Sequence, residues 1–498
     1  MLCKKAVSRY YKATMTDSID PREERERKLQ LLKDAGMDPY PAHTGRTHDI
    51  GAVITDFDRL AKDGEPIVVA GRIMAIRGHG ALLFADIFDG TGKIQGFLSK
   101  DTLGEAKFSL FESAMNPGDF VLISGKAYLT NRGTQAINAN DWKVLSKALL
   151  NIPTEHFGIK DEDERFRKRY LDILLDPELQ ELIRKKSLFW ETTRLFLKAH
   201  GFLEVETPSL ELTTGGAEAR PFMTHHNDFD IDVFMRISVG ELWQKRLMAA
   251  GLPRTFEIGR VYRNEGTSPE HLQEFTNMEF YWAYADYEDG MQLVKDLYRT
   301  IAREVFGTTT FETRGHSFDL ADEWAMIDYV SEVEKQTGVN VLTASLDEMM
   351  AKADELGISY EGKNKERLTD TLWKYCRKHI AGPAFLINHP LIVAPLAKKK
   401  ADGTTVEMFQ PIIAGSEVGR GYSELNDPID QRERFEAQQK LIESGDDEAM
   451  MPDWEFVEML EYGMPPTCGF GFGERLFAFL SDKPLRETQL FPLMKPRQ

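Results

Sequence analysis

Residues 256–287 read FEIGRVYRNEGTSPEHLQEFTNMEFYWAYADY, and this stretch decides how the larger part of the chain folds. Apolar and polar residues alternate on both sides of a turn-rich segment, which predicts two antiparallel β-strands joined by a loop. In the second predicted strand one face carries Phe275, Asn277, Glu279 and Tyr281, because side chains two positions apart point the same way. The opposite face is apolar and can pack on a hydrophobic core.

The polar face of this hairpin carries charged and aromatic side chains of several kinds. Arg263 and Glu265 share a face of the first strand, and His271 lies in the loop. An arginine fork suits a phosphate oxygen, a flat aromatic ring suits a nucleobase, and paired carboxylates suit an ammonium group. On spacing alone, a solvated sheet face with cross-strand ion pairs explains the same residue types equally well.

The amino-acid sequence of this hairpin closely resembles the second signature motif of class II aminoacyl-tRNA synthetases, in its lysyl-tRNA synthetase form. GFLEVETPSL, residues 201–210, resembles the first motif of that class, and GMPPTCGFGFGERLFAFL, residues 463–480, resembles the third. The resemblance runs from about residue 22 to the C-terminus. It implies a homodimer whose interface is built around Pro208.

The composition of the chain limits the classes of protein to which it can belong. The chain has 498 residues, 42% hydrophobic and 29% charged, which indicates a soluble globular protein of two or three domains with no membrane span. A formal net charge of −18 argues weakly against a nucleic-acid partner, although it leaves room for a local basic groove. Three widely spaced cysteines favour free thiols in a reducing compartment, and we expect a cytoplasmic protein.

The sequence predicts an α+β fold class, with an N-terminal OB-fold β-barrel followed by a class II synthetase antiparallel β-sheet catalytic domain flanked by helices. The expected divisions are an N-terminal extension and helix, an OB-fold anticodon-binding domain, a hinge and the catalytic domain, at residues 1–60, 61–150, 151–180 and 181–498. A helical insertion is expected at about 330–385.

The first fourteen residues, MLCKKAVSRYYKAT, are basic and lack the apolar centre of a secretory signal. A basic extension or a misassigned start is the favoured interpretation, with a transit peptide as the alternative. After this stretch, Asp20 can cap a helix that has Pro21 in its first turn and ends near Gly36.

Short apolar segments broken by turn residues fill positions 66–147, which fits the strands of a small barrel. Arg77, Phe84 and Gln95 have the spacing of the anticodon-binding barrel of the lysyl, aspartyl and asparaginyl synthetases. The resemblance implies that Phe84 stacks on the central anticodon base while the other two hold its edge and the backbone. A strand phenylalanine buried in the barrel core is the alternative.

A charged segment at residues 148–180 resembles the hinge of the family. Its basic cluster, Arg165, Arg167, Lys168 and Arg169, is a candidate contact for the tRNA backbone. A solvated helix face explains the same residues nearly as well.

The resemblance implies a ligase of protein biosynthesis that joins an amino-acid carboxylate to the α-phosphate of ATP and then passes the acyl group to tRNA. It implies that Arg263 contacts the α-phosphate and the substrate carboxylate, and that Phe275 and Arg475 enclose the adenine. Glu265 would accept from the adenine amino group, and His271 would approach the γ-phosphate. The catalytic residues would be Arg263, His271 and Arg475.

Magnesium is the implied cofactor, because it bridges phosphate oxygens in such sites. Glu417 is the expected ligand. Gln410 stands where the family has a magnesium-binding glutamate, which puts metal binding at that position in doubt.

Lysine is the expected amino acid. Glu424 occupies a position, seven residues past Glu417, where aspartyl relatives have an arginine, and a carboxylate there matches an ammonium. Glu279 and Tyr281 would complete the side-chain pocket, and Glu241 would bind the α-amino group near the Gly216 backbone. Arg420 stands where the family usually has asparagine or a small polar residue. It is expected to contact the lysine carboxylate, with disturbance of the pocket as the alternative.

The third motif is one residue shorter than usual between its glycines and Arg475, and Glu474 replaces the common aspartate. Two alternatives remain beside a lysine–tRNA ligase: a related enzyme acting on aspartate or on a protein lysine, and a non-catalytic nucleic-acid-binding paralogue. Amino-acid-dependent ATP–pyrophosphate exchange separates the three.

Overall fold

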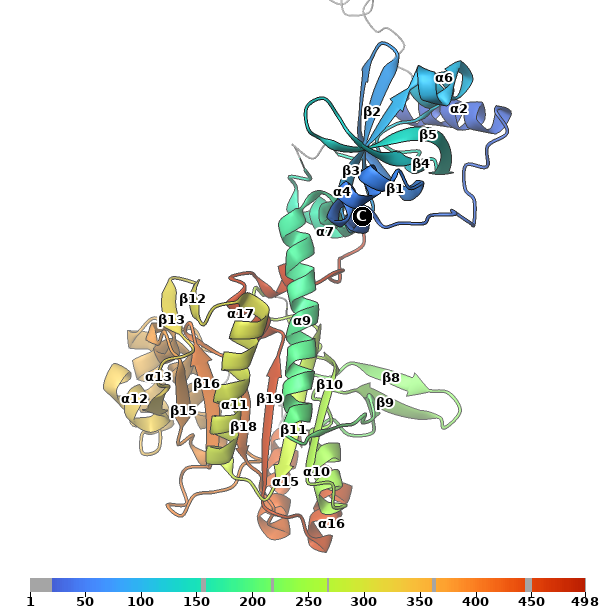
Figure 1. The fold of residues 1–498 in the computed structure, drawn as a ribbon. Helices are drawn as coiled ribbons and strands as arrows, with labels where there is room; N and C mark the ends of the chain where they lie inside the picture. Colours follow the sequence, from blue (N-terminus) through green and yellow to red (C-terminus); the bar gives the residue numbers. More distant parts are fainter. Residues whose placement is uncertain are drawn as a thin grey trace, which may run out of the picture. The chain divides into compact units, whose positions relative to one another are not determined.

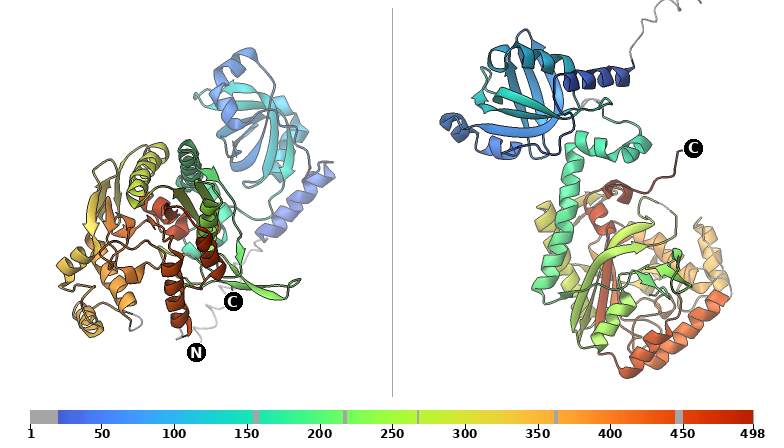
Figure 2. Two further views of the ribbon diagram at one scale, coloured as in Figure 1. Left: turned by 90° about the horizontal axis from the view of Figure 1, so that it is seen from below. Right: turned by 90° about the vertical axis from the view of Figure 1, so that its right-hand side faces the viewer.

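The computed structural model describes residues 20–153, 158–215, 219–266, 268–360, 364–443 and 450–497. Within it the chain forms two compact units, residues 1–161 and 162–498. The basic stretch at residues 1–14 lies outside the described residues. The structure is α+β, with a barrel in the first unit and a large sheet covered by helices in the second (Figures 1 and 2).

The first unit is built on a closed barrel with the strand order β1-β2-β3-β5-β4. Its alternating strands place one face inward, so that residues such as Ile87 and Ile123 are fully buried. A tight turn between β2 and β3 forms at Asp89, whose carboxylate accepts hydrogen bonds from the N–H groups of Thr91 and Gly92. The strands are β1 Ile67–His79, β2 Leu82–Phe88, β3 Lys93–Ser99, β4 Phe120–Leu129 and β5 Gln135–Ser146.

The N-terminal helix α2 begins as predicted at Pro21, with the Asp20 side chain accepting from the N–H of Arg22. Arg25 fastens this helix to the barrel through Asn151 and the main-chain oxygens of residues 117 and 148. The helices of this unit are α2 Pro21–Asp34, α3 Ile50–Thr55, α4 Phe57–Asp63, α5 Lys100–Leu103 and α6 Glu105–Ala114.

The second unit contains a sheet with the strand order β14-β15-β16-β18-β19-β11-β10-β6, with β17 paired to β16. Its central pairs are antiparallel as expected, whereas the outer pairs β14–β15 and β6–β10 are parallel, so the sheet is mixed. The strands are β6 Leu203–Glu204, β10 Arg254–Tyr262, β11 Glu274–Ala283, β14 Ala325–Asp328, β15 Ala384–Ile387, β16 Met408–Ile413, β17 Ser416–Glu417, β18 Arg420–Ser423 and β19 Thr467–Gly473.

Helices α9 (Pro177–Ala199) and α11 (Tyr287–Ile301) run along one face of this sheet (Figure 1). The apolar face predicted for the second hairpin strand packs there, with Met278 and Phe280 fully buried among side chains of both helices. Helix α9 ends where Gly201 takes a positive φ, as its sequence indicates. The alternate residues of β11 therefore face the other side of the sheet, which is free to form a site.

The predicted helical insertion contains α12 (Tyr329–Thr337), α13 (Leu346–Glu355) and α14 (Lys365–Cys376), which share their own apolar cluster. The other helices are α7 Glu162–Arg167, α8 Arg169–Leu175, α10 Glu241–Ala249, α15 Pro428–Glu443, α16 Trp454–Tyr462 and α17 Arg475–Leu480, with short turns at Ala302–Phe306, Arg377–His379, Leu391–Val393 and Leu485–Thr488. Small sheets are formed by β12 Thr310–Thr313 with β13 His316–Asp319, and by β7 Leu210–Glu211, β9 Ile231–Met235 and β8 Met223–His226.

The basic cluster at the start of the second unit is already paired with acidic side chains. Arg165 and Arg169 both contact Asp172, at 3.1 and 2.6 Å. Arg167 contacts Asp163 at 2.6 Å, and Lys168 lies 3.0 Å from Glu164. This pairing favours a structural role for the cluster over a contact with tRNA.

Among the helices described, none combines the length and apolar character needed to cross a membrane.

Candidate active site

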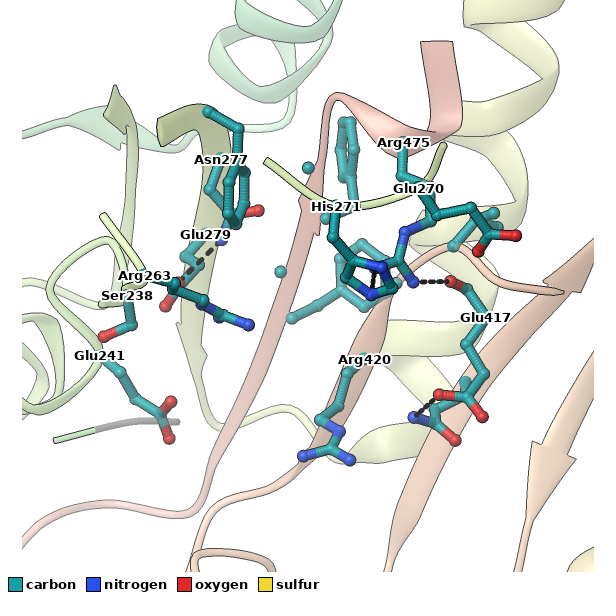
Figure 3. Close-up of a pocket in the computed structure, with 18 of the residues that line it drawn as sticks. Ser238, Glu241, Arg263, Glu270, His271, Asn277, Glu279, Glu417, Arg420 and Arg475 are labelled. Carbon is teal, nitrogen blue, oxygen red and sulfur yellow. Dashed lines mark hydrogen bonds between the residues drawn. The ribbon is translucent and has the colours of Figure 1, made fainter. Parts of the chain in front are cut away.

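A cavity of about 690 Å³ opens on the face of the sheet opposite α9 and α11 (Figure 3). It brings together residues from separate parts of the second unit. Of the residues proposed from the sequence for ATP, lysine and metal, Gly216 lies outside the described residues. The others all line the cavity, namely Glu241, Arg263, Glu265, His271, Phe275, Glu279, Tyr281, Gln410, Glu417, Arg420, Glu424 and Arg475.

One end of the cavity is formed by three buried carboxylates, Glu241, Glu279 and Glu424, which we name the acid end. Glu279 accepts hydrogen bonds from the N–H of Val239 at 2.8 Å and from the Tyr281 hydroxyl at 3.1 Å. Burial and the neighbouring Glu241 raise the pKa of Glu279 to about 7. A cation entering this end would meet, in Glu279, a carboxylate held in place by neutral donors.

The other two carboxylates of the acid end share a buried ammonium. Lys245, one turn after Glu241 on α10, places its Nζ 2.9 Å from Glu241 and 2.5 Å from Glu424. Glu241 also accepts a short hydrogen bond from the Tyr422 hydroxyl. Burial raises the pKa of Glu424 to about 8, although Lys245 acts in the opposite direction. Glu424 lines the same cavity as Arg263 and Phe275.

The glycines of the third motif make room for these carboxylates. Strand β19 pairs with β11 so that Gly469 lies opposite Tyr281 and Gly471 lies opposite Glu279. A Cβ at Gly469 would lie 2.0 Å from the Glu424 Oε1, and one at Gly471 would lie 2.8 Å from the Glu279 Cγ. Any other residue at Gly469 would displace the Glu424 carboxylate.

Arg263 and Phe275 lie between the acid end and the rest of the cavity. The Arg263 guanidinium lies 5.5 Å from the centre of the Phe275 ring and donates from Nε and Nη2 to the Ile237 carbonyl, both at 3.2 Å. Burial lowers the pKa of Arg263 from its ordinary value, but arginine stays charged. Glu265 follows along the same cavity wall. A planar cation beside an aromatic ring suits a phosphate next to a base.

The opposite end, which we name the basic end, contains His271 and Arg475 near Glu417 (Figure 3). Arg377 also belongs to it, with its Nε 3.9 Å from a Glu417 carboxylate oxygen. Arg475 donates to the Glu417 carbonyl at 3.3 Å and to the His271 Nε2 at 3.1 Å. His271 in turn contacts the Ser268 hydroxyl through Nδ1 at 2.7 Å. Desolvation and the Arg475 charge lower the pKa of His271 to about 4, so the imidazole is neutral near pH 7.

Both carboxylate oxygens of Glu417 accept hydrogen bonds from neutral side chains. Trp373 donates to Oε1 at 2.6 Å, and the Gln410 amide nitrogen donates to Oε2 at 3.0 Å. The Gln410 amide oxygen is turned away and accepts from His389 at 2.8 Å. Burial lowers the pKa of His389 to about 3, which keeps that ring neutral. Because an ionised carboxylate only accepts, Gln410 must present its NH₂ group to Glu417.

Arg420 is exposed and lies between the two ends of the cavity, at the centre of Figure 3. It stands opposite Gly471 in the β18–β19 pair, so no neighbouring side chain limits its reach on that strand. The helical insertion adds further charged side chains to the cavity wall, because α14 presents Arg367, Asp370 and Lys374 on one face.

The shortened third motif keeps Arg475 at the cavity. The β11–β19 register continues without a shift to the pair Asn277 and Gly473, and α17 begins two residues later. Glu474, at the junction, is buried and accepts from Lys186 of α9 at 2.8 Å and from the N–H of Thr276 at 2.9 Å. This residue ties the strand–helix junction to α9 and the hairpin.

In the barrel, Arg77, Phe84 and Gln95 lie close together on adjacent strands β1, β2 and β3. Arg77 pairs with Phe84 across β1–β2, and its Nη2 donates to both carboxylate oxygens of Asp86, at 2.8 and 2.9 Å. Gln95 donates to the same carboxylate at 3.3 Å. Phe84 is half-buried, outside the barrel core, and its ring centre lies 5.5 Å from that of Phe97.

Sequence reasoning missed three residues that support these groups. Lys245 falls four positions after Glu241, a spacing that places both on one helix face. Tyr422, in β18, falls two positions before Glu424, which directly follows that strand, and such a spacing favours the same side of an extended chain. Asp86 faces Gln95 across the barrel strands. These short spacings are the signals that could have found them.

Comparison with known proteins gives the family. The model of tRNA synthetases class II (D, K and N) matches residues 161–495, and that of the OB-fold nucleic acid binding domain matches residues 67–145. A lysine–tRNA ligase of Roseiflexus sp. (strain RS-1) is 42% identical over 96% of this chain and 99% of its own length. Those of Bacillus subtilis (strain 168) and Thermotoga maritima are 41% and 39% identical, each over 96% of this chain and over 98% and 96% of their own lengths. With this near-complete coverage added to the geometry of the cavity, the chain belongs to the class II lysyl-tRNA synthetases, the family of lysine–tRNA ligases.

Proposed function

We propose that the cavity activates L-lysine with ATP and that the enzyme then transfers the lysyl group to the 3′ end of tRNA(Lys). In the first step a lysine carboxylate oxygen bonds to the α-phosphorus while pyrophosphate leaves. In the second step a ribose hydroxyl of the tRNA bonds to the acyl carbon while AMP leaves. Positioning and charge stabilisation carry most of such catalysis.

The observation that carries the choice of lysine is the acid end. Glu279, Tyr281 and Glu424 all line this end of the cavity. The raised pKa values of the two glutamates indicate carboxyl groups that gain most from a cationic partner. We assign the side-chain ammonium of lysine to these three residues. Glu241 takes the α-amino group, with the Gly216 backbone proposed beside it. Arg263 and Arg420 are assigned to the carboxylate.

ATP is assigned to the middle and the basic end of the cavity. Phe275 and Arg475 would enclose the adenine, and Glu265 would accept from its amino group. Arg263 would hold the α-phosphate, where negative charge rises as the new bond forms. His271 would donate to the γ-phosphate. Its neutral imidazole carries one N–H, so contact with a phosphate requires exchange of its hydrogen bond with Ser268 or Arg475.

Glu417 would hold a magnesium ion, which would supply positive charge to offset that of the triphosphate. The residues present fit one ion held by Glu417 together with phosphate oxygens, because magnesium often binds through one carboxylate and its substrate. Gln410 does not fit as a ligand in its present hydrogen bonds, since its nitrogen faces Glu417. Within the described part of the chain, no group of three His, Cys, Asp or Glu residues could hold a metal by itself.

The barrel is proposed to bind the anticodon. Phe84 offers a half-exposed ring for base stacking, and Asp86 holds Arg77 and Gln95 beside it. Replacing Phe84 by alanine should weaken tRNA(Lys) binding by about 1–3 kcal/mol. Amino-acid activation without tRNA should be unchanged, with Leu129→Ala, an exposed barrel residue, as the control.

A homodimer through the segment around Pro208 is also proposed. Its support is a set of exposed apolar side chains in and beside the first motif, which would be covered in a dimer. They are Leu188, Leu195, Leu203, Leu210 and Leu212, with Met223, Phe229 and Ile231 on the β8–β9 hairpin that projects from the sheet (Figure 1). Sedimentation at several concentrations would test this.

The proposed compartment is the cytoplasm, consistent with free buried thiols at Cys376 and Cys468.

The decisive experiment is ATP–pyrophosphate exchange with each of the twenty amino acids in turn. We expect exchange with lysine alone. Exchange with aspartate would contradict the assignment of the acid end, and no exchange with any amino acid would favour a non-catalytic tRNA-binding protein.

A further inference from the structure

Lys245 is a buried ammonium behind the acid end, and the proposed reaction gives it no role. Its side chain is 1% exposed. It does not line the cavity, whereas both of its partners, Glu241 and Glu424, do. The lysine therefore lies outside the cavity and contacts two carboxylates that line it.

The surroundings of Lys245 fix its position. Its Nζ lies 5.6 Å from the ring centre of Tyr422 and 5.7 Å from that of Phe456, which enclose the ammonium without offering a further charge. Burial lowers the pKa of Lys245, but the two carboxylates outweigh this effect and hold it above its ordinary value. The two carboxylates thus favour the charged form of Lys245.

The formal charges of the acid end then match a substrate with two ammonium groups. Glu241, Glu279 and Glu424 contribute three negative charges when ionised, and Lys245 offsets one of them. Two remain to be offset by a ligand. A free lysine brings an α-ammonium and an ε-ammonium, whereas an uncharged side chain brings only the first. A buried charge left without a partner is costly, so the mismatch disfavours the second ligand.

We propose that Lys245 is a positioning residue for substrate selection: it aims Glu241 and Glu424 into the cavity and leaves a charge deficit that only a diammonium amino acid fills. This inference rests on the proposed function, because it assumes that lysine binds at the acid end. It adds that a residue which never touches the substrate decides how strongly lysine is preferred over its uncharged analogue.

The test measures dissociation constants by calorimetry for L-lysine and for L-norleucine, which has the lysine chain without the ε-amino group. The variants are Lys245→Gln and Lys245→Met, which remove the charge, and Lys245→Arg, which keeps it. Lys147→Gln is the matched control, because Lys147 is an equally buried lysine, 2.7 Å from Asp119 in the barrel. The KM for ATP is measured for every variant.

We expect the neutral variants to weaken lysine binding roughly 10- to 100-fold, the range for a lost charge-assisted hydrogen bond. Norleucine binding should change less than threefold or so, and the KM for ATP should stay within about twofold. The arginine variant should recover part of the lysine affinity. Lys147→Gln should lower the thermal stability without changing the affinity for either ligand.

Three outcomes would overturn the proposal. One is a neutral variant that keeps the wild-type ratio of lysine to norleucine affinity. Another is an equal loss for lysine, norleucine and ATP, which indicates a general structural defect. The third is that neither neutral variant accumulates as folded protein, which would make Lys245 a requirement of the fold. If the wild-type protein fails to bind lysine at all, the proposed function itself fails, which distinguishes the two cases.

Discussion

The acid end and the basic end of the cavity both contain buried charged groups, but these groups are stabilised in opposite ways. The acid end is almost closed to solvent, and its carboxylates are satisfied by a buried ammonium, hydroxyls and a main-chain N–H. The basic end is more open and is held by Arg475, His271 and neutral donors to Glu417. At both ends, desolvation shifts pKa values in the direction that favours the uncharged form. It raises the pKa values of Glu279 and Glu424 and lowers that of His271.

This difference teaches how the ligands divide the cavity. A carboxyl whose pKa is raised gains most from an ammonium, and a neutral imidazole beside an arginine can meet phosphate oxygens without holding a second buried charge. The acid end should therefore respond to amino-acid ligands and the basic end to ATP. Variants that affect one ligand and spare the other separate the two ends.

The largest expected effect belongs to Glu424→Gln. Removing one partner of a buried charged contact costs about 2–5 kcal/mol, so kcat/KM for lysine in pyrophosphate exchange should fall roughly 30- to 5,000-fold, while the KM for ATP stays near its wild-type value. Glu461→Gln, at an exposed ion pair of the same unit, is the control. An equal loss for ATP would mean that the two ends are not independent.

Arg475→Lys should act on the other end. A lysine lacks the fork that reaches both the Glu417 carbonyl and His271. The lost charged hydrogen bond is worth about 1.5–3 kcal/mol, which raises the KM for ATP by roughly 10- to 150-fold. The affinity for lysine alone, measured by calorimetry without ATP, should be unchanged. A weaker lysine complex would contradict the division, and Arg432→Lys on the surface serves as the control.

The pH dependence of lysine binding follows from the acid end. In the empty cavity Glu279 and Glu424, with pKa values of about 7 and about 8, hold protons at low pH. A bound ammonium favours their ionised forms, so binding releases protons. The association constant should therefore rise between pH 6 and 8, by at most about tenfold per unit for each proton released, and level off above. Calorimetry in two buffers of different ionisation enthalpy would count the protons, and uptake would contradict this sign.

The smallest expected effect is that of Gln410→Glu. The new carboxylate would face Glu417 in place of a donated hydrogen bond, at a cost of about 1.5 kcal/mol. Without metal the Tm should fall by about 2–4 °C for each kcal/mol. Added Mg²⁺ should restore it more than it does in the wild type, because two carboxylates form a better cation site. Equal responses to Mg²⁺ would show that Gln410 lies outside any metal-binding position.

Much of this site was predictable from short-range pattern. Strict alternation in β11 places Phe275, Asn277, Glu279 and Tyr281 on one face, because a strand has a period of two. The same rule, continued one residue past β18, favours the same side of the chain for Tyr422 and Glu424. The helix spacing of Lys245 from Glu241 was equally readable, but a buried Lys–Glu pair and an exposed one have the same spacing in sequence.

Other features had no local signal. Trp373 on α14 reaches Glu417 because the insertion packs against the sheet. His389, just after β15, reaches Gln410 because β15 pairs with β16. The parallel pairing of the outer strands also depends on how distant segments meet, since periodicity predicts a strand but not the direction of its neighbour.

The sequence by itself determined the family, the barrel and sheet, and the set of charged and aromatic residues that face one cavity, because alternation and motif spacing are local properties of the chain. Only the tertiary structure decided which charges are offset and which remain. Lys245 contacts Glu424 across nearly 180 positions of sequence, and burial turned those charges into shifted pKa values. Electrostatic energy depends on distance and on exclusion of water, and both are set when remote segments pack together.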